Sequence, residues 1–162
     1  MPTYVALLRG VMPTNPNVKS EKLKHVFESL GFKRVATVLA SGNVVFESPS
    51  KSATTLETKI ERALQDQLNF KTTAIVRSRE QLERLVKSDP FRGVKSDEET
   101  NYLICTFFKD SRNELCTVVD RTRDDTPGFM RRLEKEHGKE ITTRTWKTIG
   151  RILKKMGSPL AE

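Results

Sequence analysis

Polar side chains suited to holding an anion occur at two places in the first third of the chain. Arg9 ends an apolar run and is followed by Gly10, and Ser41 and Asn43 flank Gly42 in a second apolar region. A guanidinium group with nearby hydroxyl and amide groups supplies donors for a carboxylate or a phosphate. A structural role competes at both places, as a surface salt bridge of Arg9 and as a turn at residues 41–43. Arg9, Ser41 and Asn43 are therefore candidate ligand-binding residues.

A second group of cationic side chains lies near the C-terminus. Apolar residues at helical spacing predict a helix with one buried face, formed by Trp146, Ile149, Ile152, Leu153 and Met156. Basic residues fall on the opposite face, and one more precedes the helix. A cationic helix face can contact the phosphates of a nucleic acid, although most such faces are only solvated. The candidate ligand-binding residues here are Arg144, Lys147, Arg151 and Lys154, with Lys155 beside them.

The sequence contains no pattern typical of catalysis, metal binding or cofactor binding. It has no P-loop, no glycine-rich dinucleotide motif and no His-Glu-x-x-His motif. His25 and His137 lie far apart, and no metal-ligand spacing is present. Cys105 and Cys116 fall on two predicted strands that can pair, and buried cysteines commonly behave as small apolar side chains. We predict no catalytic residue, no metal and no cofactor, and the sequence leaves open whether the protein is an enzyme.

Composition limits the class of protein. The 162 residues carry a net charge of +8 and have a pI of about 9.7. This basic excess favours polyanionic partners, and a basic protein without such a partner is the competing interpretation. No apolar run approaches the roughly 20 residues of a membrane helix, so no membrane partner is expected. The absence of a signal-peptide pattern and the presence of only two cysteines predict a cytoplasmic protein without a disulfide framework.

Short apolar runs in the first 78 residues predict four strands. Residues 4–8 form a continuous apolar run, which is typical of a central strand. β-Branched and aromatic residues in the range 35–48 predict a hairpin, with Ser41-Gly42-Asn43 as a tight turn and positive φ at Gly42 and Asn43. Residues 71–77 predict the fourth strand.

Two helices are expected between these strands. The first should follow an N-cap at Ser20 and end at Gly31, and its apolar stripe consists of Leu23, Val26, Phe27 and Leu30. The second should open with a capping box formed by Thr54 and Glu57 and end near Asn69. The order β-α-β-β-α-β is typical of a ferredoxin-like unit, in which the first and third strands are central and two helices cover one face.

The second half of the chain predicts a smaller α+β arrangement. A helix should open with a capping box at Ser78 and Gln81, and strands are expected at residues 102–108 and 114–119. A further helix should begin at Thr126 and stop at Gly138, before a short strand at 141–143 and the last helix. Loops are expected at 92–100, 109–113 and 121–125. We predict one compact α+β chain, in which a ferredoxin-like subdomain of residues 1–78 packs against a second α+β subdomain of residues 79–162.

Four stretches of the chain resemble one known family. They are residues 4–10, 30–32, 41–46 and 142–148, and their order and spacing resemble the bacterial family known as domain of unknown function 1697. The resemblance implies an α+β fold with ferredoxin-like subdomains, and it implies no activity. The loop after the first strand is usually glycine-rich in that family, whereas residues 12–17 here read Met-Pro-Thr-Asn-Pro-Asn. Residues 121–127 also replace a glycine-bearing stretch, which argues against a glycine-lined anion cradle at these loops.

Three functional hypotheses follow from these observations. The first is a non-catalytic binding module for an anionic partner, such as a nucleic acid. The second is an enzyme or binder acting on a small phosphorylated or carboxylated ligand near the loop Val11–Asn17. The third is a structural protein that assembles through sheet edges. Salt-dependent binding would favour the first hypothesis, and a ligand bound in the Arg9–Ser41 region would favour the second. Sedimentation would test the third.

Overall fold

The computed structural model describes residues 1–94, 101–109, 114–120 and 126–158. Its elements are β1 (Thr3–Leu8), the 3-10 turn η1 (Pro16–Val18), α1 (Ser20–Ser29), β2 (Lys33–Thr37), β3 (Asn43–Glu47), α2 (Ala53–Leu68), β4 (Ala74–Ser78), α3 (Arg79–Lys87), β5 (Asn101–Phe108), β6 (Glu114–Asp120), α4 (Thr126–His137), β7 (Ile141–Thr145) and α5 (Trp146–Lys155). The predicted loops at 92–100, 109–113 and 121–125 lie wholly or partly outside the described residues.

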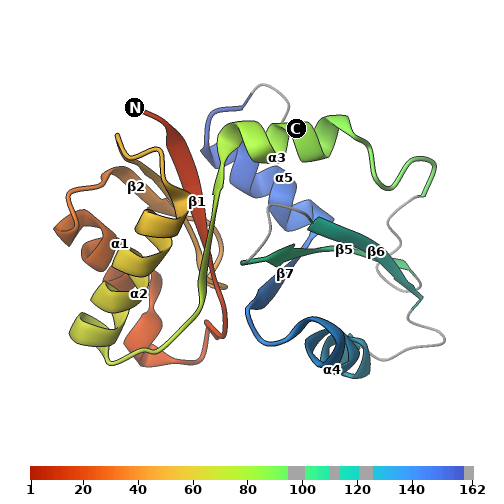
Figure 1. Cartoon of the computed structure of the whole chain (residues 1–162), viewed down its shortest axis with the longest axis horizontal. Coiled ribbons are helices and arrows are strands. Elements are labelled where there is room, and N and C mark those ends of the chain that lie inside the picture. Colours follow the sequence, from red (N-terminus) through yellow and green to blue (C-terminus); the bar gives the residue numbers. More distant parts are fainter. Residues whose placement is uncertain (95–100, 110–113, 121–125, 159–162) are drawn as a thin grey trace.

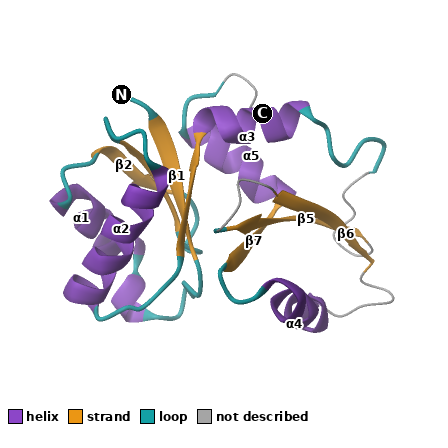
Figure 2. Ribbon diagram, in the orientation of Figure 1, coloured by secondary structure: helices purple, strands orange, loops and turns teal. Residues whose placement is uncertain are grey.

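The first sheet has the strand order β2-β3-β1-β4, and every neighbouring pair is antiparallel. The two most apolar strands, β1 and β3, occupy the central positions, as their sequences predict. Helices α1 and α2 lie together on one face of this sheet, at the left of the molecule (Figure 1). The chain is thus a mixed α+β structure with its first sheet next to a layer of two helices (Figure 2).

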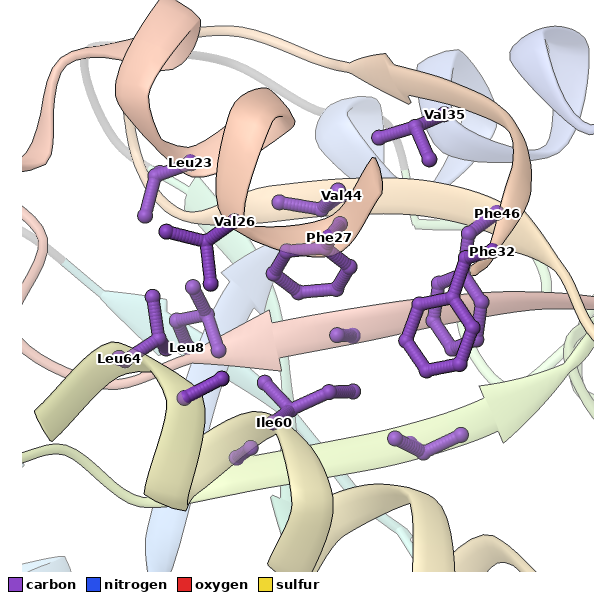
Figure 3. Packing of buried hydrophobic residues seen from close by; sticks show 14 of the residues in the cluster. Leu8, Leu23, Val26, Phe27, Phe32, Val35, Val44, Phe46, Ile60 and Leu64 are labelled. Carbon is purple, nitrogen blue, oxygen red and sulfur yellow. The ribbon is translucent and has the colours of Figure 1, made fainter. Parts of the chain in front are cut away.

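Aromatic and aliphatic side chains fill the space between this sheet and the two helices (Figure 3). The ring of Phe32 stacks on that of Phe46 with centroids 4.4 Å apart, and Phe27 meets Phe46 edge-on at 5.6 Å. Gly31 has φ of +84° just after α1, which lets the chain reverse so that Phe32 packs back beneath the helix. The predicted stripe of the first helix is therefore the core face, with Leu23, Val26 and Phe27 buried.

The opposite face of the first sheet is also buried. Apolar side chains from β1, β3 and β4 pack there against α3, α5 and β5, and this second cluster includes Val5, Leu7, Val45, Ile75, Leu82, Leu103, Cys105, Phe107, Ile149, Ile152 and Leu153. The first sheet is therefore a middle layer, which explains why the whole run of residues 4–8 is buried.

The second half contains a three-stranded antiparallel sheet with the order β6-β5-β7. Helices α3 and α5 lie on one side of it and α4 on the other (Figure 1). Strand β7 extends to Thr145, two residues beyond the predicted segment, and β4 begins at Ala74, later than predicted. Within the described parts of the chain, no helix is both long and apolar enough to cross a membrane.

Two predicted helix caps are wrong and one is right. Ser20 is the first helical residue of α1, whose cap position Lys19 makes no side-chain capping bond. Helix α2 is capped by Ser52, which accepts the N–H of Thr55, whereas Glu57 is buried and accepts a bond from β4. Ser78 and Gln81 form the predicted capping box at α3. Glu57 does not form the predicted capping box because its carboxylate accepts the backbone N–H of Val76 on the edge of the sheet instead.

The predicted tight hairpin turn is a longer connection, of residues 38–42. Positive φ occurs at Leu39 (+58°) and Gly42 (+83°), whereas Asn43 is the first residue of β3. The Asn43 side chain donates to the carbonyl of Val38 at 2.9 Å, and the N–H of Val38 donates to the Asn43 carbonyl at 2.9 Å. Asn43 therefore closes the loop from within the strand, which removes the need for positive φ at that residue.

Candidate anion-binding site

Arg144 joins the two sheets. It lies on β7, and its side chain is 8% exposed. Its Nη2 donates to the carbonyl of Leu8 at the end of β1 at 2.9 Å, and its Nε donates to Oδ1 of Asn43 on β3 at 2.6 Å. One guanidinium from the second sheet thus holds the ends of the two central strands of the first.

The remaining donors of Arg144 are also engaged. Nη1 donates to Oγ1 of Thr142 at 2.6 Å and to the Thr143 carbonyl at 2.9 Å, and Nη2 also approaches the carbonyls of Ser41 and Gly42 at 3.3 Å each. Among the described residues, these acceptors are all neutral oxygens. Burial lowers the pKa of Arg144 to about 10, because the charged form has lost its water. Arg144 therefore remains a cation at neutral pH, and its hydrogen bonds go to neutral oxygens among the described residues.

A pocket of about 460 Å³ lies beside this guanidinium. It opens between the loop after β1, helix α4 and strand β7, and it is lined by Arg9, Gly10, Met12, Met130, Glu134, Ile141, Thr142, Thr143 and Arg144. Arg9 donates through Nη1 to the Ile141 carbonyl at 3.0 Å and forms an ion pair with Glu134. Two cations and one carboxylate thus line the pocket, and its lining carries a net positive charge.

The predicted site residues fall into two separate groups. Arg9 and Arg144 line the pocket, while Ser41 and Asn43 lie behind it. Asn43 is 1% exposed and bonds to Arg144, so its contacts are those of the competing structural role. Ser41 contributes its carbonyl to Arg144, and its hydroxyl accepts a bond from Asn43 at 3.0 Å. Arg144 thus binds both Asn43 and Ser41, but of these four residues only the two arginines line the pocket.

The second group lies on the outer face of α5. Lys147, Arg151 and Lys154 are exposed there, opposite the buried apolar stripe. Arg144, the candidate that precedes the helix, does not share this face. The reason is that Arg144 belongs to a strand, where alternate residues point to opposite sides, and its side faces the first sheet.

Sequence reasoning missed three residues of the pocket that matter chemically. Thr142 is two positions before Arg144, but the predicted strand ends at residue 143, so the side that they share follows only from the full length of β7. Glu134 and Met130 lie four apart on α4, but nothing in the sequence indicates that this helix packs beside the loop after β1. The position of Glu134 and Met130 beside the pocket depends on how the second half of the chain packs against the first.

The histidines do not form a metal site in the described parts of the chain. His25 is exposed on α1, and the ring of His137 packs edge-on against Phe108 at 5.0 Å. The described residues hold no cluster of three side chains able to ligate a metal. Cys105 and Cys116 are free and face each other across β5 and β6, which confirms that they are neighbours.

The fold and this pocket define a mixed α+β protein with two antiparallel sheets joined by a buried arginine. The chain belongs to the family described as "Protein of unknown function (DUF1697)", whose model matches residues 1–130. This confirms the resemblance, and three of the four stretches that indicated it lie within the matched residues, whereas residues 142–148 lie outside them.

The fold is similar to that of a conserved bacterial protein, SP0830, from Streptococcus pneumoniae. The TM-score is 0.74 over 96% of this chain and 98% of the other, with 18% sequence identity. Similarity at this level of identity concerns the fold alone. No curated protein matches the chain.

Proposed function

We propose that this protein is a non-catalytic binding protein for a small anion that carries a carboxylate or phosphate group. The ligand occupies the pocket between the loop after β1, helix α4 and strand β7. The supporting observation is that the buried cation Arg144 lines the same pocket as Arg9. Among the described residues, the hydrogen-bond acceptors of Arg144 are neutral oxygens. A buried charge without a counter-charge costs free energy, and a bound anion reduces that cost.

The two arginines have different roles in this proposal. The donors of Arg144 are already engaged, so it acts through its charge, which is felt strongly in a poorly hydrated site. Arg9 is 30% exposed in its side chain and is the residue that contacts the ligand. A planar guanidinium can bind a carboxylate or phosphate through two parallel hydrogen bonds. The anion therefore competes with the carboxylate of Glu134 for Arg9.

This competition gives a test with variants that act in opposite directions. Binding of inorganic phosphate and of malonate is measured by titration calorimetry for the parent protein, Arg9→Gln and Glu134→Gln. Arg9→Gln should weaken binding by about tenfold or more, because a hydrogen bond to a charged group is worth about 1.5–3 kcal/mol. Glu134→Gln should strengthen binding, since it removes the internal competitor and one negative charge.

The matched control is Lys24→Gln, which removes the same charge from the exposed side of α1. It should leave affinity close to that of the parent. Equal weakening in Lys24→Gln and Arg9→Gln would show that only net charge matters, and a parent that binds neither anion at millimolar concentration would reject the proposal.

A second candidate function is supported by α5. Its sequence from Trp146 to Lys155 contains no acidic residue, and its outer face exposes Arg151, Lys154 and Lys155. We infer that residues 1–78 form a ferredoxin-like unit, a fold in which some proteins bind RNA bases on the open face of the sheet. Here the second cluster covers that face, so a nucleic acid would have to be held by the α5 surface through its phosphates.

The salt dependence of binding tests this candidate. Affinity for a short duplex and for a single strand is measured across a salt series. Replacing Lys147, Arg151 and Lys154 by Gln should reduce the slope of log affinity against log salt by roughly 2–3 if each contacts a phosphate. The control triple variant, with Lys22, Lys24 and Lys33 changed to Gln, should keep the parent slope. If the parent protein binds neither nucleic acid at low salt, the nucleic-acid function is rejected and the small-anion function is the one that remains.

A further inference from the structure

Strands β5 and β6 place two thiols directly opposite each other. Cys105 pairs in register with Cys116, and their Sγ atoms are 2.8 Å apart. Residues opposite each other in an antiparallel pair project from the same face of the sheet. Cys105 is fully buried in the second core cluster, and Cys116 is half-buried on β6, the edge strand of its sheet.

This arrangement is close to that of a disulfide bond. Opposite residues of antiparallel strands have Cα atoms about 4.5–5.5 Å apart, inside the range of roughly 4.4–6.8 Å that disulfides span. Joining the two sulfur atoms requires them to approach by less than about 1 Å from their present separation. The bond can therefore form without a change in strand pairing.

The two thiols differ in reactivity. They share a hydrogen bond in which either sulfur can donate, and this bond lowers the pKa of Cys116. The same bond, together with burial, raises the pKa of Cys105. Burial and the charge of Glu114 raise the pKa of Cys116, but the hydrogen bond has the larger effect. Cys116 is half-buried on an edge strand whereas Cys105 is fully buried, so Cys116 is the attacking sulfur and Cys105 the second one.

A pocket beside α3 borders β6 two residues before Cys116, which is not one of its lining residues. The pocket has a volume of about 300 Å³ and is lined by Glu114 on β6 and by Gln81, Arg84, Leu85 and Ser88 of α3 and its cap. Glu114 and Cys116 are two residues apart on one strand, so their side chains lie on the same face. Arg84 and Glu114 place one positive and one negative charge in this lining, so the pocket does not select for the charge of a reagent.

We propose that Cys105 and Cys116 form a redox-active dithiol site that reacts with small disulfides of the glutathione class. The Cys116 thiolate attacks one sulfur of the reagent, whose S–S bond breaks and releases one thiolate. Cys105 then gives up its proton and attacks Sγ of Cys116, which releases the second thiolate. In total, two protein thiols and one disulfide give one protein disulfide and two small thiols, a transfer of two electrons to the reagent.

The test equilibrates the full chain with buffers of varied ratio of reduced to oxidised glutathione, without oxygen. The reaction is stopped with acid, free thiols are alkylated with N-ethylmaleimide, and the intact mass is measured. At oxidising ratios the parent should lose both alkylatable thiols together, become two hydrogen atoms lighter and carry no glutathione. Cys105→Ser should accumulate one glutathione on Cys116, because the second sulfur is missing. Cys116→Ser should remain unmodified, since Cys105 is buried.

Two results would overturn the proposal. One is a parent that holds glutathione at equilibrium without an internal disulfide, and the other is a pair of thiols that stays reduced at every ratio until denaturant is added. A brief treatment of the reduced parent with N-ethylmaleimide provides evidence that needs no variant. Peptide mapping should find the first label on Cys116, and a first label on Cys105 would contradict the assigned roles.

Discussion

Gly42 lies where three parts of the site meet. Its carbonyl accepts the N–H of Leu8 at 2.8 Å and is also approached by Arg144. A Cβ at this position would lie 2.9 Å from the Leu8 carbonyl oxygen and 3.0 Å from the side chain of Val11. With φ of +83°, the position is strained for any other residue as well. Close approach and backbone conformation therefore both require glycine.

Replacing Gly42 by Ala is expected to lower the free energy of unfolding by about 2–5 kcal/mol, from backbone strain and overpacking together. Gly31→Ala is the matched control. Gly31 has nearly the same φ, +84°, but open space around it, so only the strain of about 1 kcal/mol remains. Urea titration of both variants provides the measurement. Equal losses would show that the contact with Leu8 and Val11 contributes nothing.

At this scale the sequence predicts conformation better than contacts. The positive φ of Gly42 follows from its flanking residues, and the sequence indicated it. The hydrogen-bond partners of Arg144 do not follow from its neighbours in sequence, because Leu8 and Asn43 lie more than a hundred residues away in the chain. A long-range hydrogen bond leaves no local pattern, so the sequence groups Arg144 only with the basic residues of the helix that it precedes.

Helix α2 covers the edge of the first sheet with two carboxylates. Glu57 accepts the N–H of Val76 and Glu61 accepts that of Ala74, each at 2.9 Å. Four residues of helix rise about 6 Å, and two residues of strand extend about 6.7 Å, so the spacings match. These N–H groups on the edge strand β4 are thus engaged within the chain. Assembly through this edge, the third sequence-based hypothesis, would have to displace them.

The buried carboxylate of Glu57 should give stability a measurable pH dependence. Burial raises the pKa of Glu57, although the Val76 N–H and the charges of Lys109 and Arg77 oppose this shift. The folded state then binds more protons than the unfolded state between the unfolded and folded pKa values. The contribution of this group to stability is therefore largest below the unfolded pKa and falls as pH rises through that window.

Glu57→Gln cannot titrate and keeps an oxygen acceptor for Val76. The difference in unfolding free energy, variant minus parent, should therefore increase as pH rises from about 4 through the folded pKa. Urea titrations at several pH values measure this difference, and a flat or falling difference would contradict the interpretation. Glu57→Leu also removes the acceptor, so it should lose about 1–3 kcal/mol even where Glu57 is protonated.

At the scale of elements, apolar periodicity was a reliable guide and capping patterns were not. The stripe of α1 and the runs in β1 and β3 bury the residues that their spacing predicts. The capping box at Thr54 and Glu57 failed because the sheet edge offers Glu57 a buried donor, whereas a cap would leave it in water. A capping motif forms only if no group from elsewhere in the fold binds its side chain instead, and the local sequence does not show such groups.

The whole molecule is held together through a sheet that is buried on both faces. One face packs against α1 and α2, and the other packs against α3, α5 and the second sheet. Polar contacts join the halves as well, since Arg77 donates to the Phe108 carbonyl at 2.8 Å and Lys109 pairs with Glu61. The element order of each half was predictable, but their docking was not, because it depends on side chains from distant segments meeting at one surface.

Residues 1–78 alone should therefore behave differently from the same residues in the full chain. The isolated segment would expose the sheet face formed by Val5, Leu7, Val45 and Ile75, all of which are buried here. A contiguous apolar patch of this kind promotes self-association and binds hydrophobic dyes. Sedimentation and dye fluorescence should show an associating, dye-binding fragment, whereas the full chain should remain dye-free and unfold in one transition.

A matched fragment separates this cause from simple unfolding. Leu7→Gln and Ile75→Gln, introduced together into residues 1–78, place polar groups on the newly exposed face and leave the cluster beneath α1 and α2 intact. This fragment should bind less dye and sediment as a smaller species than the unmodified one. The same two changes in the full chain should destabilise it by several kcal/mol, because both side chains become buried polar groups. A wild-type fragment that is monomeric, dye-free and cooperatively folded would show that the second half is not needed to cover the sheet.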